Sequence, residues 1–256
     1  MKPISVPVGR SSLFALVLTF SLLYSQDASA LDLSRIWPIA GAGAVVKENR
    51  TVERFRALRL DTGARIVLRQ GDRFSVEVQA EDNVAPLIET YVEDGTLVIT
   101  DNKHYKSSNA QVVVTARRIS SIATTGAVAI LAEDLNSPSL RLSMGGSSAV
   151  TLRAVSINKL HASLGGSSAL KVSGLADDFV TELGGSSTVE ASELAASAVS
   201  VDGGGSAQAV VWAKESLRLT LGGSCSVSYY GNVSPVVATS GAAAVKSLGD
   251  VSARRQ

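Results

Sequence analysis

Few side chains in this sequence have the type and spacing that catalysis or metal binding requires. The chain has 2 histidines, His104 in the polar stretch DNKHYK and His161 between two apolar residues. Neither histidine has a second histidine or a carboxylate at the spacing of metal ligands, and a zinc site needs several such ligands. We expect both histidines to be structural or solvated, and we expect no metal site and no cofactor.

The motifs of a serine nucleophile are incomplete as well. The stretch GGSSA at 145–149 ends in alanine, whereas the nucleophile motif Gly-x-Ser-x-Gly ends in glycine. Two Ser-x-x-Lys strings, at 156–159 and 168–171, are expected by chance in so serine-rich a chain. The sequence therefore provides no recognisable serine nucleophile.

Carboxylates are the remaining candidates for chemistry. The acidic groupings in the second half are Glu133-Asp134, Asp177-Asp178, and Glu190 with Glu193. A polysaccharide lyase needs carboxylates, often holding calcium, beside a basic residue that removes or stabilises a proton. Nothing in the sequence places Arg153 or Lys171 beside these carboxylates. We predict that the protein is not an enzyme, and a lyase-like, carbohydrate-active enzyme is the alternative.

Side chains that differ between otherwise similar segments are the candidates for ligand contact. They are Asp177, Asp178, Asp202, Trp212, Tyr229 and Tyr230. The aromatic members form the densest aromatic group near the C-terminal end, where they would contact a carbohydrate. Closing an apolar core is the more common role of such large rings.

The element that must position these residues is a repeat. Gly-Gly followed by Ser begins at Gly145, Gly165, Gly184, Gly204 and Gly222, and degenerate copies at Gly126 and Gly241 extend the series. The copies are 18 to 20 residues apart, and a fixed period of this length indicates stacked repeats. Leu, Val and Ile alternate around each glycine pair, which argues against a flexible linker.

Each repeat is predicted to contain about three short strands joined by corners. Leu140, Leu142 and Met144 alternate with polar residues before the glycines, and apolar residues alternate after them with a change of phase at Ala154. The same order recurs in every unit. Parallel coils about 4.8 Å apart explain this better than antiparallel Gly-Gly hairpins, which are the alternative.

The glycines of such coils are expected at corners that need positive φ, and the serines are expected to bond to neighbouring turns. We therefore predict that Gly165→Val disrupts folding more than Ser163→Val. Cys225 replaces the second serine of its repeat and is expected to be a small packing residue. Only Asp202 directly adjoins a glycine corner, so a regular calcium ladder is not expected.

The chain begins with the features of a secretory signal. Residues 1–30 combine a basic start, an apolar run at 13–24 and the small residues of Ala28-Ser29-Ala30. The run is too short to cross a bilayer, for which about 20 residues are needed. We expect export to the periplasm, the cell surface or the outside, with no integral membrane span in the mature chain.

The rest of the chain divides into a lead-in segment, one domain and a tail. We expect a lead-in without regular period at 31–51, a β-solenoid domain at 52–248 and a polar tail at 249–256. The domain has a strand-rich part at 52–118 and the glycine-serine repeats at 119–248. The strand-rich part is predicted to contain a short helical turn near Pro86, a hairpin around Asp94-Gly95 and a surface loop at 101–109.

Composition limits the partners. The sequence has 24 Lys+Arg and 23 Asp+Glu, and without residues 1–30 it is formally neutral. Neutrality gives no reason to expect nucleic acid or an anionic membrane surface as partner. A single cysteine excludes an intrachain disulfide, so burial and backbone pairing must stabilise the fold.

Several short motifs, in their order, resemble those of a bacterial family. They are Phe55, Asp61-Thr62-Gly63, Arg69-Gln70-Gly71-Asp72, the segment from Asp82-Asn83 to Glu89, Asp94-Gly95-Thr96-Leu97 and the glycine-serine repeats. The chain is similar to exported proteins with auto-transporter adhesin head domains, or GIN domains. Where the family pattern has Gly-Ile-Asn, this chain has Gly63-Ala64-Arg65. The resemblance implies a right-handed β-solenoid.

Repeat and resemblance together lead to one expectation. We predict an all-β protein, a right-handed parallel β-solenoid with 18–20 residues per coil and an N-terminal strand-rich cap. Its expected role is that of an exported, non-catalytic binding or adhesion module of the cell envelope, with a glycan or a surface protein as partner. The alternatives are a lyase-like solenoid enzyme and a structural envelope protein that self-associates into homo-oligomers through exposed strand edges.

Overall fold

The fold was obtained as a computed structural model, which describes residues 37–250. The predicted signal peptide at 1–30 and most of the predicted tail lie outside the described residues. The described chain is nearly all β, with one short 3-10 helix at Ala85–Leu87. Strands stack in parallel as a β-solenoid, which confirms the fold class predicted from the period.

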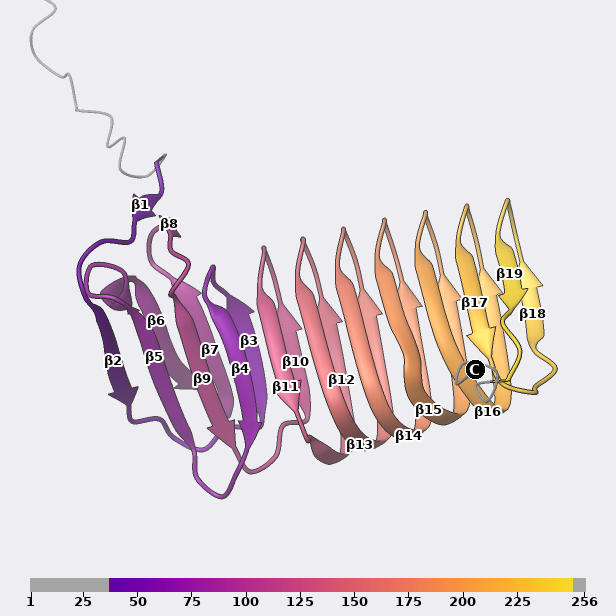
Figure 1. The fold of residues 1–256 in the computed structure, drawn as a ribbon, viewed down its shortest axis with the longest axis horizontal. Helices are drawn as coiled ribbons and strands as arrows, with labels where there is room; N and C mark the ends of the chain where they lie inside the picture. The colour runs from indigo at the N-terminus through magenta and orange to yellow at the C-terminus, as the bar shows by residue number, and fades with distance from the viewer. Residues whose placement is uncertain (1–36, 251–256) are drawn as a thin grey trace, which may run out of the picture. The chain divides into compact units, whose positions relative to one another are not determined.

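The repeats form successive parallel coils (Figure 1). Their strands are β10 (Ser121–Thr124), β11 (Ala129–Glu133), β12 (Asn136–Met144), β13 (Ala149–Leu164), β14 (Ala169–Leu183), β15 (Thr188–Gly203), β16 (Gln208–Leu221), β17 (Ser226–Tyr230), β18 (Val236–Thr239) and β19 (Ala244–Ser247). Leu142 pairs in parallel with Ala162 of the next coil, and Ala162 pairs with Thr181 of the one after. The hairpin alternative is therefore wrong.

Each coil has two main faces joined by a glycine corner on one side and a bend on the other (Figure 1). We call the strands that enter the glycine corners sheet 1; they are β10, β18 and the C-terminal halves of β12 to β16. Sheet 2 consists of the strands that leave the corners, which are β11, β17, β19 and the N-terminal halves of β13 to β16. The bend begins at Ala154, where φ is +51°, and a short paired segment at 155–157 follows it.

The N-terminal part extends the stack in an order that differs from the order of the chain. Its parallel strands are β3 (Ala57–Asp61), β4 (Arg65–Gln70), β7 (Thr96–Asp101) and β9 (Gln111–Ala116). The coil of β3 and β4 lies between two coils that both follow it in sequence, because β3 pairs with β7 on one side and with β10 on the other.

Antiparallel strands lie against the coil formed by β7 and β9. They are β2 (Val45–Arg50), β5 (Ser75–Glu81) and β6 (Ile88–Glu93), and a small parallel ladder joins β1 (Ile39–Ala40) to β8 (Tyr105–Lys106). β5 pairs with β9, β2 pairs with β5, and β6 pairs with β7 through the predicted Asp94-Gly95 hairpin. β2 lies in the segment that we expected to be irregular, and its pairing with β5 makes it a strand.

The core lies between sheets 1 and 2, where alternate side chains of each strand point inward. One row of inward side chains across β12 to β16 consists of Leu140, Leu160, Phe179, Val199 and Leu217, each at most 3% exposed. Stacking of successive coils buries these side chains, as the repeat pattern requires.

The corner itself corrects one prediction. Gly165 was expected to hold the restricted angles, but it is Gly166 that has a positive φ of +70°. A Cβ on Gly166 would lie 2.4 Å from the Gly146 carbonyl oxygen of the previous coil, whereas a Cβ on Gly165 would lie 3.8 Å from the nearest carbonyl oxygen, that of Met144. The positive φ recurs at the degenerate corners Gly126 and Gly241, where it is +75° and +88°.

The two serines that follow the glycines have different roles. The first donates its backbone N–H to the previous corner, as Ser167 does to the Gly146 oxygen at 2.8 Å. The second points inward. Ser148 and Ser168 bond within their own turn, Ser168 Oγ donating to the Gly165 oxygen at 2.6 Å. By contrast, the buried Ser187 Oγ has no hydrogen-bond partner among the described residues. Cys225 occupies this second position and is buried, as expected of a packing residue.

Glu81 ties β5 to the loop that precedes β9. Its carboxylate accepts hydrogen bonds from Ser107 Oγ at 2.6 Å and from Asn109 Nδ2 at 2.8 Å. These bonds, led by that of Ser107, hold the pKa of Glu81 below its usual value. A lowered pKa means that ionised Glu81 stabilises the fold above its ordinary titration range, and that this contribution disappears as the pH falls through the folded-state pKa.

We therefore expect Glu81→Gln to lower the melting temperature at pH 7. The difference should shrink as the pH falls below the ordinary Glu pKa of about 4.3 and should vanish only below the lowered folded-state pKa. Thermal unfolding followed by circular dichroism across this pH range measures the difference. Glu77→Gln is the matched control, since Glu77 lies on the same strand and contacts only the exposed Lys47 at 3.5 Å. A Glu81→Gln deficit that does not depend on pH would contradict the argument.

Candidate functional site

The structure separates the six residues that were predicted to contact a ligand. Asp178 is half-buried on sheet 1, Asp177 is exposed beside it at the bend, and Asp202 is exposed nearer the glycine corners. Trp212 and Tyr230 are register neighbours on β16 and β17. Tyr229 is only 8% exposed and belongs to the core. These residues therefore do not form one site.

Asp178 lies in a groove on the outer face of sheet 1. The groove has a volume of about 560 Å³ and crosses strands β12 to β16. Its floor contains two rows of outward side chains, with the inward row of Leu160 and Phe179 between them. The first row is Ser139, Lys159, Asp178, Ala198 and Ser216, and the second is Arg141, His161, Val180, Ser200 and Arg218.

Side-chain size explains why the surface is hollow at this place. Between its basic ends the groove carries the short side chains of Ala198 and Ser200 on β15, which are half-buried. Longer basic side chains, Arg141 and Lys159, are exposed toward one end, and Arg218 is exposed toward the other. Since successive coils are about 4.8 Å apart, each row spans on the order of 19 Å. The groove therefore suits an extended chain better than a compact ligand.

The charge of the groove is mainly positive. Within the described chain, no carboxylate lies within ion-pair distance of Arg141, Lys159 or Arg218. Asp178 is the one carboxylate in the lining. His161 Nε2 lies 3.4 Å from Glu182 Oε1 of the next coil, a contact that sequence spacing does not reveal. The neutral total of residues 31–256 conceals this local excess.

Sequence reasoning missed Arg141, Lys159 and Arg218. Each is an isolated basic residue in the chain, and only the parallel register brings them onto one surface. The period of 18 to 20 residues contained this information, because residues one period apart occupy the same row. A comparison of the charge at each repeat position would have identified the groove.

A second basic–acidic contact also escaped the sequence analysis. Arg153, which nothing in the sequence placed beside a carboxylate, lies 3.3 Å from Glu133 of the previous coil. Lys171 is likewise the register neighbour of Glu190. Both pairs are on sheet 2, are exposed or half-exposed, and line no part of the groove.

A polar cluster around Asp101 is the other group with perturbed titration. Asp101 accepts hydrogen bonds from Thr62 Oγ1 at 2.6 Å and from the Gly63 N–H at 2.7 Å. Burial raises the pKa of Asp101, and burial also raises the pKa of Tyr105 beside it. The cluster joins the corner after β3 to the loop after β7. Its hydrogen bonds are satisfied locally, so we assign it a structural role.

Residues 37–250 contain neither a cluster of metal ligands nor a membrane-spanning helix. In this part of the chain, no group of three or more His, Cys, Asp or Glu side chains is placed to hold a metal ion. No helix within the same range has the length and apolar character needed to cross a bilayer.

The sequence matches a known protein family over most of its length. The sequence profile of the family described as "Putative auto-transporter adhesin, head GIN domain" matches residues 54–233. The chain belongs to this GIN-domain family. The match covers the N-terminal coils, most of the glycine-serine repeats and every residue of the groove, and it confirms the resemblance seen in the motifs.

Solved structures of other bacterial proteins have a similar fold. A protein from Bacteroides fragilis described as a "putative adhesin" is 19% identical, with a TM-score of 0.71 over 82% of this chain and 100% of the other. A "putative lipid binding protein" from Parabacteroides distasonis is 18% identical, with a TM-score of 0.65 over 83% and 100%. At these identities the likeness shows the fold alone. A comparison with curated proteins finds no match.

Proposed function

We propose that this GIN-domain protein is an exported, non-catalytic binding module that holds an extended partner in the groove of sheet 1. The observation that carries the proposal is the groove itself, an open hollow that crosses β12 to β16 with short polar side chains on its floor. The signal-like sequence at 1–30 supports export. The descriptions of structural relatives as adhesins support a role in surface binding.

The partner that suits this geometry best is a glycan chain. Ser139, Ser200 and Ser216 offer hydroxyl groups along the groove, and Arg141 and Lys159 offer charged donors. Each hydroxyl is both donor and acceptor, as sugar hydroxyls are. A chain that lies along the rows would meet at least one polar side chain at each coil.

The lining favours binding over lyase-like catalysis. A lyase site needs several carboxylates or a cation held by them, beside a basic residue. The groove contributes Asp178 with Lys159 as its register neighbour, and no further acidic side chain. The alternative of self-association instead concerns the end of the stack, where β18 pairs with β16 and its side chains are exposed.

The test is to fill the groove. Ser200→Trp places a large ring on the groove floor, and it is expected to weaken binding to an immobilised polysaccharide panel at least tenfold, because the ring occupies the space of the ligand. Ser228→Trp is the matched control, since Ser228 is an outward, half-buried serine on sheet 2. Biolayer interferometry measures both, and sedimentation velocity at tens of micromolar checks that the binding species is a monomer.

Two results would count against the proposal. Equal losses for Ser200→Trp and Ser228→Trp would show that the groove is not the binding surface. Reproducible formation of new reducing ends or unsaturated products from any polysaccharide of the panel would show that the protein is an enzyme.

A further inference from the structure

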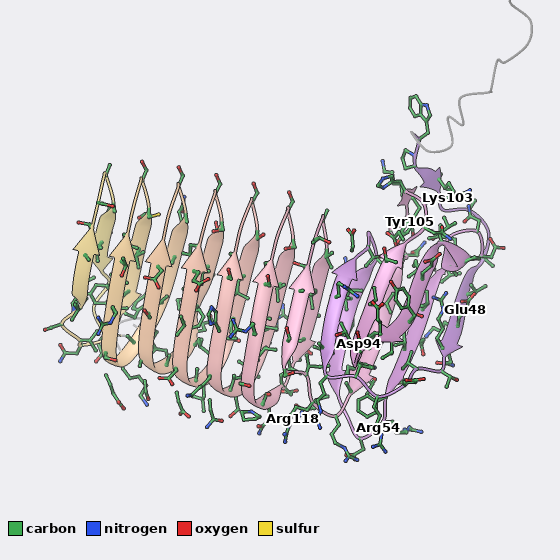
Figure 2. All side chains as sticks on the ribbon, turned by 180° about the vertical axis from the view of Figure 1, so that it is seen from behind. Glu48, Arg54, Asp94, Lys103, Tyr105 and Arg118 are labelled. Atoms are coloured by element: carbon green, nitrogen blue, oxygen red, sulfur yellow. The ribbon has the colours of Figure 1, made fainter. Side chains whose placement is uncertain are left out.

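A second hollow lies on the same face, at the bend side of the N-terminal coils. It has a volume of about 750 Å³, and its basic lining residues are Arg54, Arg56, Arg117 and Arg118. They come from the loop before β3 and the loop after β9, and the turns at 71–74 and 94–95 complete the wall. Figure 2 shows Arg54 and Arg118 at this side of the coils, away from Lys103 and Tyr105. We call it the arginine hollow.

The backbone that carries these arginines is held in place. The Arg56 N–H donates to the Gly95 oxygen at 2.9 Å, and the Arg56 oxygen accepts from the N–H of Ser120 at 2.8 Å. Gln70 Nε2 donates to the Arg117 oxygen at 2.9 Å. Beneath them, Phe55 and Phe74 pack edge to face with ring centroids 5.4 Å apart. The loops of the arginine hollow are therefore fixed at several points before any ligand binds.

Most of this positive charge has no acidic partner among residues 37–250. Arg117 lies 4.0 Å from Asp72, and both side chains are largely exposed, so this pair is weak. Among the described residues, no carboxylate lies within ion-pair distance of Arg54, Arg56 or Arg118. Four arginines face two aspartates in the lining. Guanidinium groups without an acidic partner bind carboxylate, sulfate or phosphate through paired hydrogen bonds.

The arginine hollow and the groove belong to one surface. Thr96 and Ala57 line the hollow, and parallel register continues from them through Ser121 to Arg141 in the groove. Ser120, which lines the groove, donates its Oγ to the Arg56 oxygen at 3.1 Å. The row from Thr96 to Arg218 crosses eight strands and spans on the order of 34 Å. The arginines of the hollow lie beside its start, Arg141 lies near its middle and Arg218 lies at its end.

From this arrangement we infer that the ligand is an acidic polysaccharide, which runs along the groove and places anionic groups in the arginine hollow. The inference rests on the proposed function of the groove. A membrane surface fits less well, because none of the large exposed apolar side chains lines either hollow. Nucleic acid also fits less well, because the groove lining includes no Trp or Tyr and one buried Phe, whereas single strands bind through exposed aromatic platforms.

The test compares polymers that differ in charge alone. Wild-type protein is titrated with polygalacturonate and with its fully methyl-esterified form, and with dextran sulfate and dextran. The hollow variant is the triple substitution Arg54→Gln, Arg56→Gln, Arg118→Gln. Its control is the triple substitution Arg65→Gln, Lys171→Gln, Lys246→Gln, which removes the same charge from exposed positions of sheet 2 and of β4, which continues that sheet. Melting temperatures confirm that both variants fold.

We expect acidic polymers to bind at least tenfold more tightly than their neutral partners, and this preference to fall as salt is raised. The hollow variant should lose at least tenfold in affinity for acidic polymers, and the control less than twofold. Equal binding of neutral and acidic polymers would contradict the inference that the ligand is acidic, whereas the proposal that the groove binds a glycan would stand. Equal losses of affinity in the two triple variants would show that the arginine hollow does not hold the anionic groups of the ligand. Binding to phosphatidylglycerol vesicles or oligo-dT, without binding to acidic polymers, would replace the polysaccharide by a lipid or a nucleic acid.

Discussion

Replacing Gly166 by alanine is expected to destabilise the protein by about 4 kcal/mol or more. The residue has a φ of +70°, which costs an L-residue free energy by itself. The new Cβ would also lie 2.4 Å from the Gly146 oxygen. That oxygen already accepts the inter-coil hydrogen bond from the Ser167 N–H, so it cannot move away without breaking the stack. Denaturant unfolding followed by circular dichroism measures the loss.

Gly165→Ala is the control for this experiment, because the two glycines are adjacent and receive the same methyl group. Gly165 has no positive φ, and its Cβ would make an ordinary contact at 3.8 Å. We expect its effect to stay within about 1 kcal/mol. Equal effects at the two positions would mean that Gly-Gly acts as a flexible spacer, contrary to the corner geometry.

Phe179→Ala is expected to destabilise the protein by about 3–5 kcal/mol. Phe179 is 1% exposed and fills the place that Leu160 and Val199 occupy in the adjacent coils. Removing its ring leaves a cavity between two sheets whose backbones are held by ladders on both sides, so the site cannot collapse to fill it. The denaturation midpoint should fall with little change in the dependence on denaturant.

Val180→Ala tests whether that loss comes from the core. Val180 is the next residue on the same strand, points outward into the groove and is half-buried. A loss below about 1 kcal/mol is expected for it. A loss as large as that of Phe179→Ala would show that the strand, rather than the ring, determines the stability of this coil.

The repeats could be predicted from sequence because each coil restates the same local pattern. Alternation around Leu140 and Val150 identified both sheets, and even the degenerate corner at Gly241 was found. The assignment of the strained angle to Gly165 was wrong because spacing cannot distinguish two adjacent glycines. Their difference lies in which Cβ would face the carbonyl of the previous coil, and that depends on the three-dimensional stack.

The N-terminal coils were less predictable, since they lack a period. β2 carries the sequence VVKENR, whose charged residues gave no clear strand pattern. Its pairing with β5, the packing of Val46 on the core and the hydrogen bonds of Arg50 to the Ile88 and Ala85 oxygens stabilise it. The candidate site was harder still. Asp178 was selected as an acidic residue, whereas the basic residues that surround it come from coils one or two periods away. Tyr229 was selected for its ring, which the structure places in the core.

The position of β3 and β4 in the stack has a consequence for the route of folding. Coils of the repeat region add to their predecessor through contacts about one period apart, so this region can grow by successive local steps. The coil of β3 and β4 gains its first neighbour only when the chain up to β7 exists and its second only when β10 exists, because Ala57 pairs with Thr96 and with Ser121. Closing such long loops is slow. The repeat region is thus the natural nucleus, and the N-terminal coils, which carry the arginine hollow, assemble onto it last.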